Sequence, residues 1–389
     1  MKLALAFGVI ALAGAAPQAP VLGFDYGAKR LSWYVPGTLA HAAGGTTSWN
    51  RSLCSWSFAP GGRRVALSDC NGTVRFLAVP SLKVLGATRP GDLWDAAGLA
   101  WVTPGRLLAV NRASGGVATL LVVDTSTGRV VRRVDLRGVL LDRAVVRDRV
   151  VMLVAPFDSF GPARVVTADA NGDVRTAAIA GISAGSHFDN AADTGPVGEV
   201  RTPGFAVDPA GTAYVVGADL RVATVELASM RVSYHGPTRV LAKALNGTTR
   251  IAAWLGNGRI AVSGIDYASS GSGRDLQVTS TPFGLHLLDT STWTYRTLTT
   301  TAAGLIAAGR TVFATAPDAF GAYAATGAHL YDLSMAGRSW LTAAGRYAYV
   351  CTDRWLTRIT DLTTGGDVTV PRPKTRACPT LLAGRASQL

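Results

Sequence analysis

The sequence predicts an all-β fold made from one repeated four-stranded unit, and three observations support this prediction. Apolar and polar residues alternate with period two along most of the 389 residues, and no long segment has a clean helical period. A hairpin-like phrase, "LLVVDTSTGRVVRRVDL" at 120–136, returns as "HLLDTSTWTYRTL" at 286–298 and as "RITDLTTGGDVTV" at 358–370. The 44 glycines and 18 prolines fit many short strands joined by tight turns.

The spacing of the repeated turn predicts how the units assemble. The strand that precedes the turn ends at a marker residue, and the successive markers are 44, 45, 57, 63, 43 and 29 residues apart. The markers are Pro80, Asp124, Asp169, Glu226, Asp289, Asp332 and Asp361. A second hairpin with a glycine-containing turn precedes most of them, as in "FAVDPAGTAYVV" at 205–216. Each unit therefore has four strands, and a period of about 40–45 residues with this content is typical of a β-propeller.

A single propeller over residues 21–372 follows, because one four-stranded blade cannot bury both of its faces alone. We predict seven blades, with eight as the alternative. The sequence has seven inner hairpins and an additional outer hairpin at 21–36, and the last spacing is short. An N-terminal segment that completes a C-terminal blade would explain both facts.

Three segments resemble the YVTN-type repeats of secreted bacterial β-propellers, and more loosely WD-repeat proteins. They are "RRVALSDCNGTVRFLAVPSLKV" (63–84), "TAYVVGADLRVATVELASMRV" (212–232) and "RYAYVCTDRWLTRITDLTTGGDV" (346–368). In that family a Tyr-Val pair opens an inner strand and an Asp ends the next strand. Tyr349 with Asp361 matches this pattern, and Tyr214 with Glu226 matches it less well. The Thr-Asn of the family motif and the Trp-Asp of WD repeats are absent. The resemblance implies a propeller and leaves the activity open, because such propellers serve as scaffolds, receptors, lactonases and quinoprotein dehydrogenases.

The first residues indicate export. Lys2 precedes the apolar stretch "LALAFGVIALAGA", which has the length of a signal-peptide core and is too short to span a bilayer. We expect cleavage after a signal peptide at 1–16, and a secreted, extracellular protein without a transmembrane segment. The composition favours a bacterial source.

The four cysteines suit an oxidising compartment. Cys54 and Cys70 bracket a hairpin whose turn is centred on Gly61-Gly62, so the strand register brings them within disulfide reach. Cys351 and Cys378 then form the second pair and hold the tail, residues 373–389, against the last blade. A metal site of four thiolates is the alternative, but the sequence has no C-x2-C pair.

The net charge of +13 comes almost wholly from arginine. A basic surface can attract nucleic acid, anionic lipid or acidic polysaccharide. The arginines are scattered, however, and form no run of five or more. We interpret them as solvated strand faces and expect no specific nucleic-acid partner.

The candidate binding site lies on the face where a propeller carries its longer connections. These connect the second strand to the third and one blade to the next, and rigid scaffolds often place function there. The longest stretches of this kind are 37–53, 155–164, 180–204, 236–249, 264–284 and 316–327. The candidate ligand-binding residues are Asp158, Phe160, His187, Asp189, Asp193, Asp266, Tyr267, Asp318 and Phe320.

Two patterns among these residues have a functional and a structural interpretation each. "APFDSFGPA" and "APDAFGAYA" share an aromatic ring near a carboxylate, which could bind a sugar or a cation, or could form a turn with the ring packed on the blade. The loop at 181–195 gathers His187, Asp189 and Asp193, which could ligate Ca²⁺ or belong to a polar, turn-rich loop. Calcium is therefore the alternative to our expectation of no cofactor.

Two functions remain open at this point. The first is an exported, monomeric, non-enzymatic propeller that binds a protein, a cell-wall polymer or a small molecule on its loop face. The second is an exported lactonase-like or quinoprotein-like enzyme with a metal or cofactor at the central channel. The expected innermost strands, such as "SWSFAP" and "GLIAA", carry mostly small and apolar residues, and no catalytic motif is present. This favours binding and names no catalytic residue.

Overall fold

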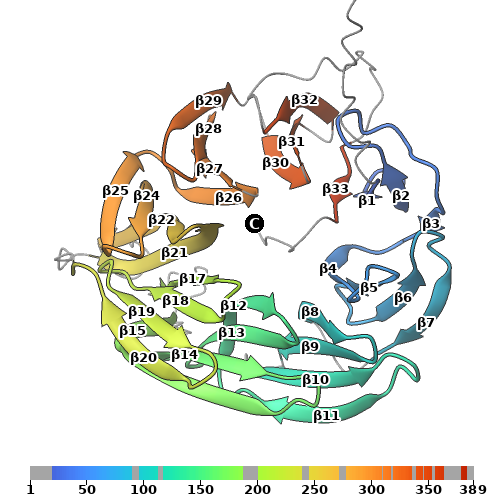
Figure 1. Cartoon of the computed structure of the whole chain (residues 1–389), viewed down its shortest axis with the longest axis horizontal. Helices are drawn as coiled ribbons and strands as arrows, with labels where there is room; N and C mark the ends of the chain where they lie inside the picture. Colours follow the sequence, from blue (N-terminus) through green and yellow to red (C-terminus); the bar gives the residue numbers. More distant parts are fainter. Residues whose placement is uncertain are drawn as a thin grey trace, which may run out of the picture.

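The computed structural model describes residues 20–89, 96–112, 117–186, 200–238, 245–270, 277–308, 310–316, 319–334, 339–344, 346–352, 355–362 and 378–382. Every regular element in these ranges is a β-strand, and they contain no helix that could cross a membrane. The sheets stand side by side around a central opening (Figure 1). The predicted all-β propeller arrangement is therefore confirmed. The expected signal peptide lies outside the described residues.

Five sheets are separate four-stranded antiparallel blades. One contains β33 (Thr380–Leu381), β1 (Val21–Asp25), β2 (Arg30–Tyr34) and β3 (Thr47–Ser48). The next two contain β4 (Leu53–Phe58), β5 (Arg64–Asp69), β6 (Val74–Ala78) and β7 (Val84–Thr88), and β8 (Ala96–Thr103), β9 (Arg106–Arg112), β10 (Ala118–Asp124) and β11 (Val130–Asp135). The other two contain β17 (Gly204–Val207), β18 (Thr212–Val216), β19 (Val222–Glu226) and β20 (Arg231–His235), and β26 (Gly304–Ala308), β27 (Thr311–Thr315), β28 (Ala319–Ala324) and β29 (His329–Ser334).

The remaining strands form two sheets of other sizes. The ten-stranded sheet contains β12 (Val139–Val146), β13 (Arg149–Ala155), β14 (Phe160–Ala168), β15 (Val174–Ser186), β16 (Val200–Thr202), β21 (Leu245–Gly256), β22 (Arg259–Ser270), β23 (Gln277–Pro282), β24 (Leu285–Asp289) and β25 (Thr294–Thr299). The three-stranded sheet contains β30 (Ser339–Ala344), β31 (Tyr347–Thr352) and β32 (Trp355–Asp361).

The prediction of seven four-stranded blades, with eight as the alternative, is wrong. The described residues form a propeller with five four-stranded blades. Counting repeats assumes that each set of hairpins makes a sheet of its own. Instead β16 pairs with β15 on one side and with β21 on the other, so two groups of strands merge into the ten-stranded sheet. The sheet of β30–β32 has only three strands in the part of the chain that the structure describes.

One of the seven sequence markers was assigned to the wrong strand. Asp332 lies within β29, the fourth strand of its blade, and pairs in register with Gly321. The third strand, β28, ends at Ala324, which stands opposite Thr311. The spacing of 29 residues before Asp361 is short for this reason, and not because a strand is missing between the two markers.

The ring closes in the opposite sense to the one expected. The C-terminal strand β33 pairs with β1 and completes the blade of β1–β3, with Gly23 opposite Leu381. The described residues thus show a C-terminal segment that completes an N-terminal blade. Part of the expected tail is therefore a strand of the ring.

Packing between neighbouring sheets explains the alternation in the sequence. In β13, all six residues from Val150 to Ala155 are buried. Met152 and its alternate neighbours pack with Leu108 of the preceding blade, whereas Leu153 and its alternate neighbours pack with Phe205 of the following one. The outermost strand β11 is mostly exposed, because it has no sheet beyond it.

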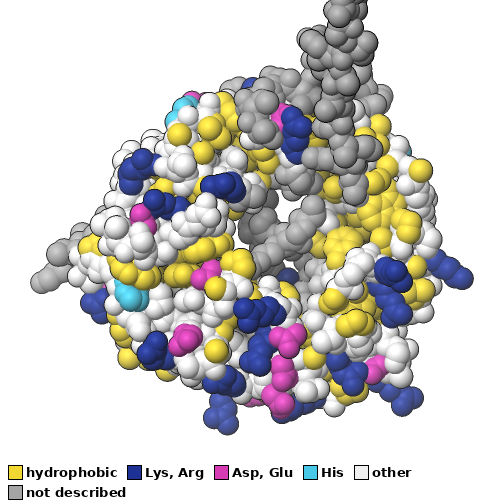
Figure 2. Space-filling view, viewed as in Figure 1, with side chains coloured by type: hydrophobic (Ala, Val, Ile, Leu, Met, Phe, Trp, Pro, Cys, Tyr) yellow, Lys and Arg dark blue, Asp and Glu magenta, His cyan; other side chains and the backbone are white. Residues whose placement is uncertain are grey.

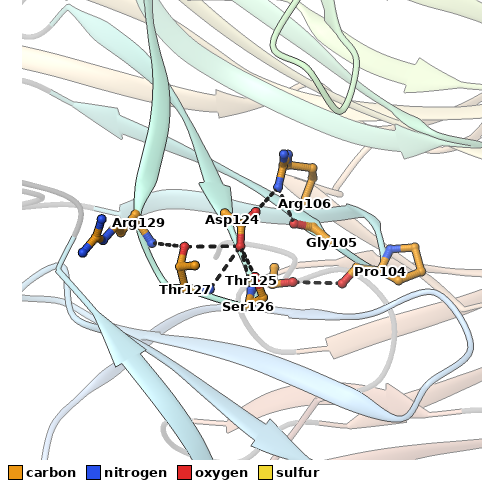
Figure 3. A network of polar contacts seen from close by, with 8 residues as sticks. All are labelled: Pro104, Gly105, Arg106, Asp124, Thr125, Ser126, Thr127 and Arg129. Atoms are coloured by element: carbon orange, nitrogen blue, oxygen red, sulfur yellow. Dashed lines mark hydrogen bonds and ion pairs between the residues drawn. The ribbon is translucent and has the colours of Figure 1, made fainter.

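The repeated turn is held by the carboxylate that precedes it (Figure 3). Oδ1 of Asp124 accepts hydrogen bonds from Ser126 Oγ at 2.5 Å, Ser126 N at 2.9 Å and Thr127 N at 3.1 Å. Oδ2 forms an ion pair with Arg106 at the start of β9. The Ser126 hydroxyl, with the other donors, holds the pKa of Asp124 well below its usual value.

The same arrangement occurs at other corners of the ring. Asp289 accepts hydrogen bonds from Ser291 and pairs with Arg259, and the Ser291 hydroxyl leads the groups that lower the pKa of Asp289 to about 2. Asp361 pairs with Arg346, whose Nε donates at 2.9 and 2.8 Å. The repeated phrase of the sequence is therefore a repeated Asp–Arg corner.

Two disulfide bonds join the pairs expected from the hairpin register, Cys54–Cys70 and Cys351–Cys378. Their Cα atoms are 5.1 and 5.9 Å apart. Cys54 and Cys70 are half-buried, whereas Cys351 and Cys378 are buried. The second bond ties β31 to the segment that leads into β33, next to the place where the ring closes.

Candidate functional site

A polar cleft lies at the loop ends of the strands, where β18 leads to β19 and where β15 leads toward the next blade. Its volume is about 230 Å³. The lining residues are Gly181, Ile182, Ser183, Arg201, Gly217, Ala218, Asp219, Gly247 and Thr248. All of them belong to connections or strand ends on the face that the sequence predicts for binding.

The cleft is built by strands that extend beyond the blades. The long strands β15, β21 and β22 continue past their neighbours, and β16 pairs with β15 antiparallel and with β21 in parallel. In the segment 264–284, expected to be an irregular loop, the end of β22 and all of β23 instead pair with each other, from Ile265 opposite Pro282 to Ser270 opposite Gln277. Backbone hydrogen bonds therefore fix the walls of the cleft.

A single row of paired residues crosses this extension. Phe160 is opposite Gly185, Gly185 opposite Arg201, Arg201 opposite Thr248, and Thr248 opposite Asp266. Residues that are directly opposite in paired strands share one face of the sheet. The row therefore brings Phe160 and Asp266, two of the candidates from separate loops, onto the face that carries Arg201 and Thr248. We call it the cross-strand row.

Gly185 allows its two neighbours in this row, Phe160 and Arg201, to meet. It has a φ of +129°, and a Cβ there would lie 2.0 Å from the carbonyl oxygen of Ser159. Without a side chain between them, the Arg201 guanidinium lies over the Phe160 ring at 4.7 Å. Arg201 also donates a hydrogen bond to Ser183 Oγ at 3.3 Å. Its charged group is thus held beside the cleft by a ring and a hydroxyl.

A buried ion pair lies next to the cleft wall. The Arg250 side chain is fully buried and donates to Asp266 Oδ1 at 2.6 Å, to Ala218 O at 3.2 Å and to Thr249 O at 3.0 Å. Its guanidinium also lies 3.7 Å from the centre of the Phe283 ring. Because Ala218 lines the cleft and Thr249 directly follows the lining residue Thr248, these hydrogen bonds hold the backbone at two of its walls.

The rim of the cleft carries one acid and one tyrosine. The Asp219 carboxylate accepts a hydrogen bond from Arg221 N at 3.2 Å and lies 3.9 Å from Arg221 Nε. The Tyr234 hydroxyl accepts a hydrogen bond from Gly181 N at 3.0 Å, and 44% of Tyr234 is exposed. Hydroxyl, carboxylate, guanidinium and aromatic groups therefore border one small space.

The remaining candidates have diverse surroundings. Asp158 is exposed in the turn before β14, with a φ of +45°. Phe320, the counterpart of Phe160, is buried among Phe313, Ala322 and Val350, as the structural interpretation of its phrase predicts. Tyr267 stands opposite Gly247 in β22 and is half-buried. His187, Asp189, Asp193 and Asp318 lie outside the described residues.

Sequence reasoning missed Arg201, Ser183, Asp219 and Thr248. Each is an ordinary surface residue type without a motif, and their proximity depends on β16 pairing with both β15 and β21. The available signal was position alone, since Ser183 and Arg201 fall within the expected loop stretch 180–204 and Thr248 within 236–249. In the described part of the chain, no group of three His, Cys, Asp or Glu residues could hold a metal ion.

A second space of about 200 Å³ lies at the turn end of the ten-stranded sheet. Arg259 and Asp289 in its wall form one of the Asp–Arg corners, and Arg296 donates to Thr326 O. Since these side chains hold turns, we assign this space a structural role. Lysine and arginine side chains are spread around the face shown in Figure 2 rather than gathered in one patch, in agreement with the scattered arginines of the sequence.

Comparison with known proteins supports the fold. No protein-family model matches the sequence, and no curated protein matches it. The solved structure of "dihydro-heme d1 dehydrogenase NirN in complex with DHE" is similar, with a TM-score of 0.61 and 13% identity over 93% of this chain and 73% of that one. BamB from Moraxella catarrhalis is similar with a TM-score of 0.51 and 13% identity, over 87% of this chain and 92% of that one. Both neighbours are β-propeller proteins. The chain has a propeller-type fold. At 13% identity the similarity shows the fold alone.

Proposed function

We propose that this protein is an exported, non-enzymatic propeller that binds a ligand in the polar cleft at its loop ends. The observation that supports this most directly is the cross-strand row. It places Arg201 and Thr248 at one small cleft and fixes their backbones within a continuous sheet. Binding sites of small ligands combine such rigid walls with a few placed polar groups.

Export is supported by the disulfide bonds as well as by the proposed signal peptide at 1–16. Structural disulfides persist mainly in oxidising compartments, outside the cytosol. We extend the YVTN-type resemblance to the same conclusion, since Tyr214 and Tyr349 both lie in the second strand of their sheets and both are buried. N-terminal sequencing of protein from culture medium is expected to begin between about residues 14 and 20.

The binding proposal is tested by filling the cleft. The variant Ala218→Trp places an indole among the lining residues, and Thr294→Trp does the same in the space at the turn end. Both variants and the unchanged protein are screened by thermal unfolding against cell-wall polymer fragments, small metabolites and purified exported proteins. A ligand at 100 times its Kd stabilises a protein by about 2.7 kcal/mol, which raises Tm by several degrees.

The expected ligand raises the Tm of the unchanged protein and of Thr294→Trp, but not that of Ala218→Trp. If the two tryptophan variants respond equally to every ligand, the cleft is not the binding site. Metal analysis and absorption spectra of the same preparation provide the second criterion. A stoichiometric metal ion or cofactor in the purified protein, together with substrate turnover, would replace this proposal with the enzyme alternative.

A further inference from the structure

The charges around the cleft do not balance. Arg250 is paired with Asp266 at 2.6 Å, and Arg221 lies beside Asp219 at 3.9 Å. Arg201 has no carboxylate within ion-pair distance in the described part of the chain. These five groups therefore carry one net positive charge, and it is located at Arg201. A ligand with one negative charge would complete the set.

Arg201 is oriented before any ligand arrives. The Phe160 ring supports one flat side of its guanidinium at 4.7 Å, and Ser183 Oγ accepts a hydrogen bond from Nη1 at 3.3 Å. A guanidinium has five N–H donors in a planar fork, and that fork matches the two oxygens of a carboxylate. A side chain held in this way loses little freedom when it binds such a group.

The other polar groups of the cleft suit hydroxyls. Ser183 and Thr248 can each donate and accept a hydrogen bond, and the Asp219 carboxylate only accepts. A sugar ring offers hydroxyls that satisfy both kinds of group. The half-exposed Tyr234 ring beside Gly181 offers an apolar surface of the kind on which sugar rings stack. The Asp219 charge disfavours a phosphate dianion, since it would repel the second negative charge.

The size of the cleft limits the ligand. A volume of about 230 Å³ corresponds to roughly eight water molecules at about 30 Å³ each. That is room for one sugar ring rather than for a folded partner or a large cofactor.

We propose that the cleft binds one uronic acid residue, with Arg201 paired to the sugar carboxylate and Asp219, Ser183 and Thr248 bonded to its hydroxyls. This inference rests on the proposed function and narrows it to acidic carbohydrate. The shared chemistry is a hexuronate, either free or as a unit of an acidic polysaccharide.

The test is isothermal titration calorimetry on the disulfide-bonded protein with four probes: galacturonate, digalacturonate, galactose and inorganic phosphate. We expect both acids to bind, galactose to bind at least about tenfold more weakly, and phosphate to bind more weakly than the acids. Acid binding is expected to weaken with salt, because the ion pair is partly exposed. Tighter binding of digalacturonate than of galacturonate would identify a polymer as the source, and equal binding would identify a free sugar acid. Either result supports a site for the sugar carboxylate.

Three variants locate the interaction. Arg201→Gln is expected to weaken galacturonate binding by at least about tenfold, and Arg201→Lys by less, because lysine keeps the charge and loses the fork. Arg149→Gln removes one positive charge at the start of β13, at the turn end, and is the matched control that is expected to leave binding unchanged. Thermal unfolding of each variant shows whether it is folded, and the comparison of acid with galactose on the unchanged protein needs no variant.

The outcomes separate this inference from the proposed function. Equal binding of galactose and galacturonate, phosphate binding as tight as acid binding, or acid binding that Arg201→Gln does not weaken would each overturn the uronate site. The proposed function survives these results if Ala218→Trp still abolishes binding of any ligand. If none of the four probes binds and another ligand depends on the cleft, only the uronate site is lost. If no ligand at all depends on the cleft, both conclusions fail.

Discussion

The turn ends and the loop ends of the strands are stabilised in different ways. At the turn ends one arrangement recurs, an aspartate that pairs with an arginine at or just before the start of the adjacent strand. Asp124 and Asp289 also accept hydrogen bonds from their own turns. At the loop ends the stabilising contacts are of several different kinds. There, β16 bridges β15 and β21, Arg250 is buried against Asp266, and both disulfides close. The turn ends thus repeat one arrangement, whereas the loop ends combine different ones, and two of these, β16 and the Arg250–Asp266 pair, lie at the cleft.

The largest expected effect is at the loop end. Asp266→Ala should lower the free energy of unfolding by about 3–5 kcal/mol, because it leaves the fully buried Arg250 guanidinium without its carboxylate. Equilibrium unfolding in guanidinium chloride measures the loss. The matched control is Asp124→Ala, which removes a carboxylate that is 21% exposed at a turn end and should cost clearly less. Equal losses at the two positions would contradict the distinction between the two ends.

The next effects concern the two disulfides, whose loss should lower the free energy of unfolding by different amounts. Replacement of Cys54 and Cys70 together by serine should destabilise the protein by about 3 kcal/mol, because a loop with a sequence separation of 16 is no longer closed in the unfolded chain. The same change at Cys351 and Cys378, with a separation of 27, should cost slightly more. Thermal unfolding of the two double variants, without reductant, checks the order. A double variant as stable as the unchanged protein would show that its disulfide does not constrain the fold.

A pH effect is expected where the end of β20 meets the β24–β25 turn. His235 stacks on Trp293 with ring centres 3.8 Å apart, and burial lowers the pKa of His235 below its usual value of 6.5. The unfolded chain therefore binds a proton more readily than the folded one, so this contribution to stability is full above pH 6.5 and is lost as the pH falls. The unfolding free energy should fall more steeply between pH 7 and pH 5 for the unchanged protein than for His235→Gln. Parallel profiles would remove His235 as the cause.

The smallest expected effect comes from adding an Asp–Arg corner at Ala324, where the sequence has no aspartate. Ala324 ends β28 opposite Thr311, and Arg310 directly precedes Thr311 in the chain. In the same way Asp361 stands opposite Tyr347, and Arg346 directly precedes Tyr347. Ala324→Asp should therefore create an Asp–Arg corner and add up to about 1 kcal/mol of stability, the upper range for exposed ion pairs. In the double variant with Arg310→Gln the gain should disappear. A gain that persists without Arg310 would show that the turn alone accounts for it.

Recurrence of a phrase and the register of a single hairpin decide which features could be predicted from the sequence. Asp124, Asp289 and Asp361 could be recognised because the same turn phrase recurs around them. The Cys54–Cys70 pair followed from the register of one hairpin. Asp332 misled the alignment because β29 also carries an aspartate, one strand after the expected place.

The cleft and the blade number depended on pairing that no local pattern indicates. β16 has three residues, and its parallel pairing with β21 links Arg201 to Thr248 across 47 positions of the chain. That pairing merges two groups of strands into one sheet, so the repeat count overstated the number of separate blades. It also turned Phe160 and Asp266, chosen only for their residue types, into members of one row.

The pairing of β33 with β1 has a consequence for synthesis. β1 emerges from the ribosome among the first strands, whereas its partner at Thr380 and Leu381 follows some 350 residues later. Until then the hydrogen-bonding edge of β1 that β33 covers has no partner, and contacts of such sequence separation form slowly. The blade of β1–β3 therefore stays incomplete while the other sheets are synthesised, and it is the last to be closed.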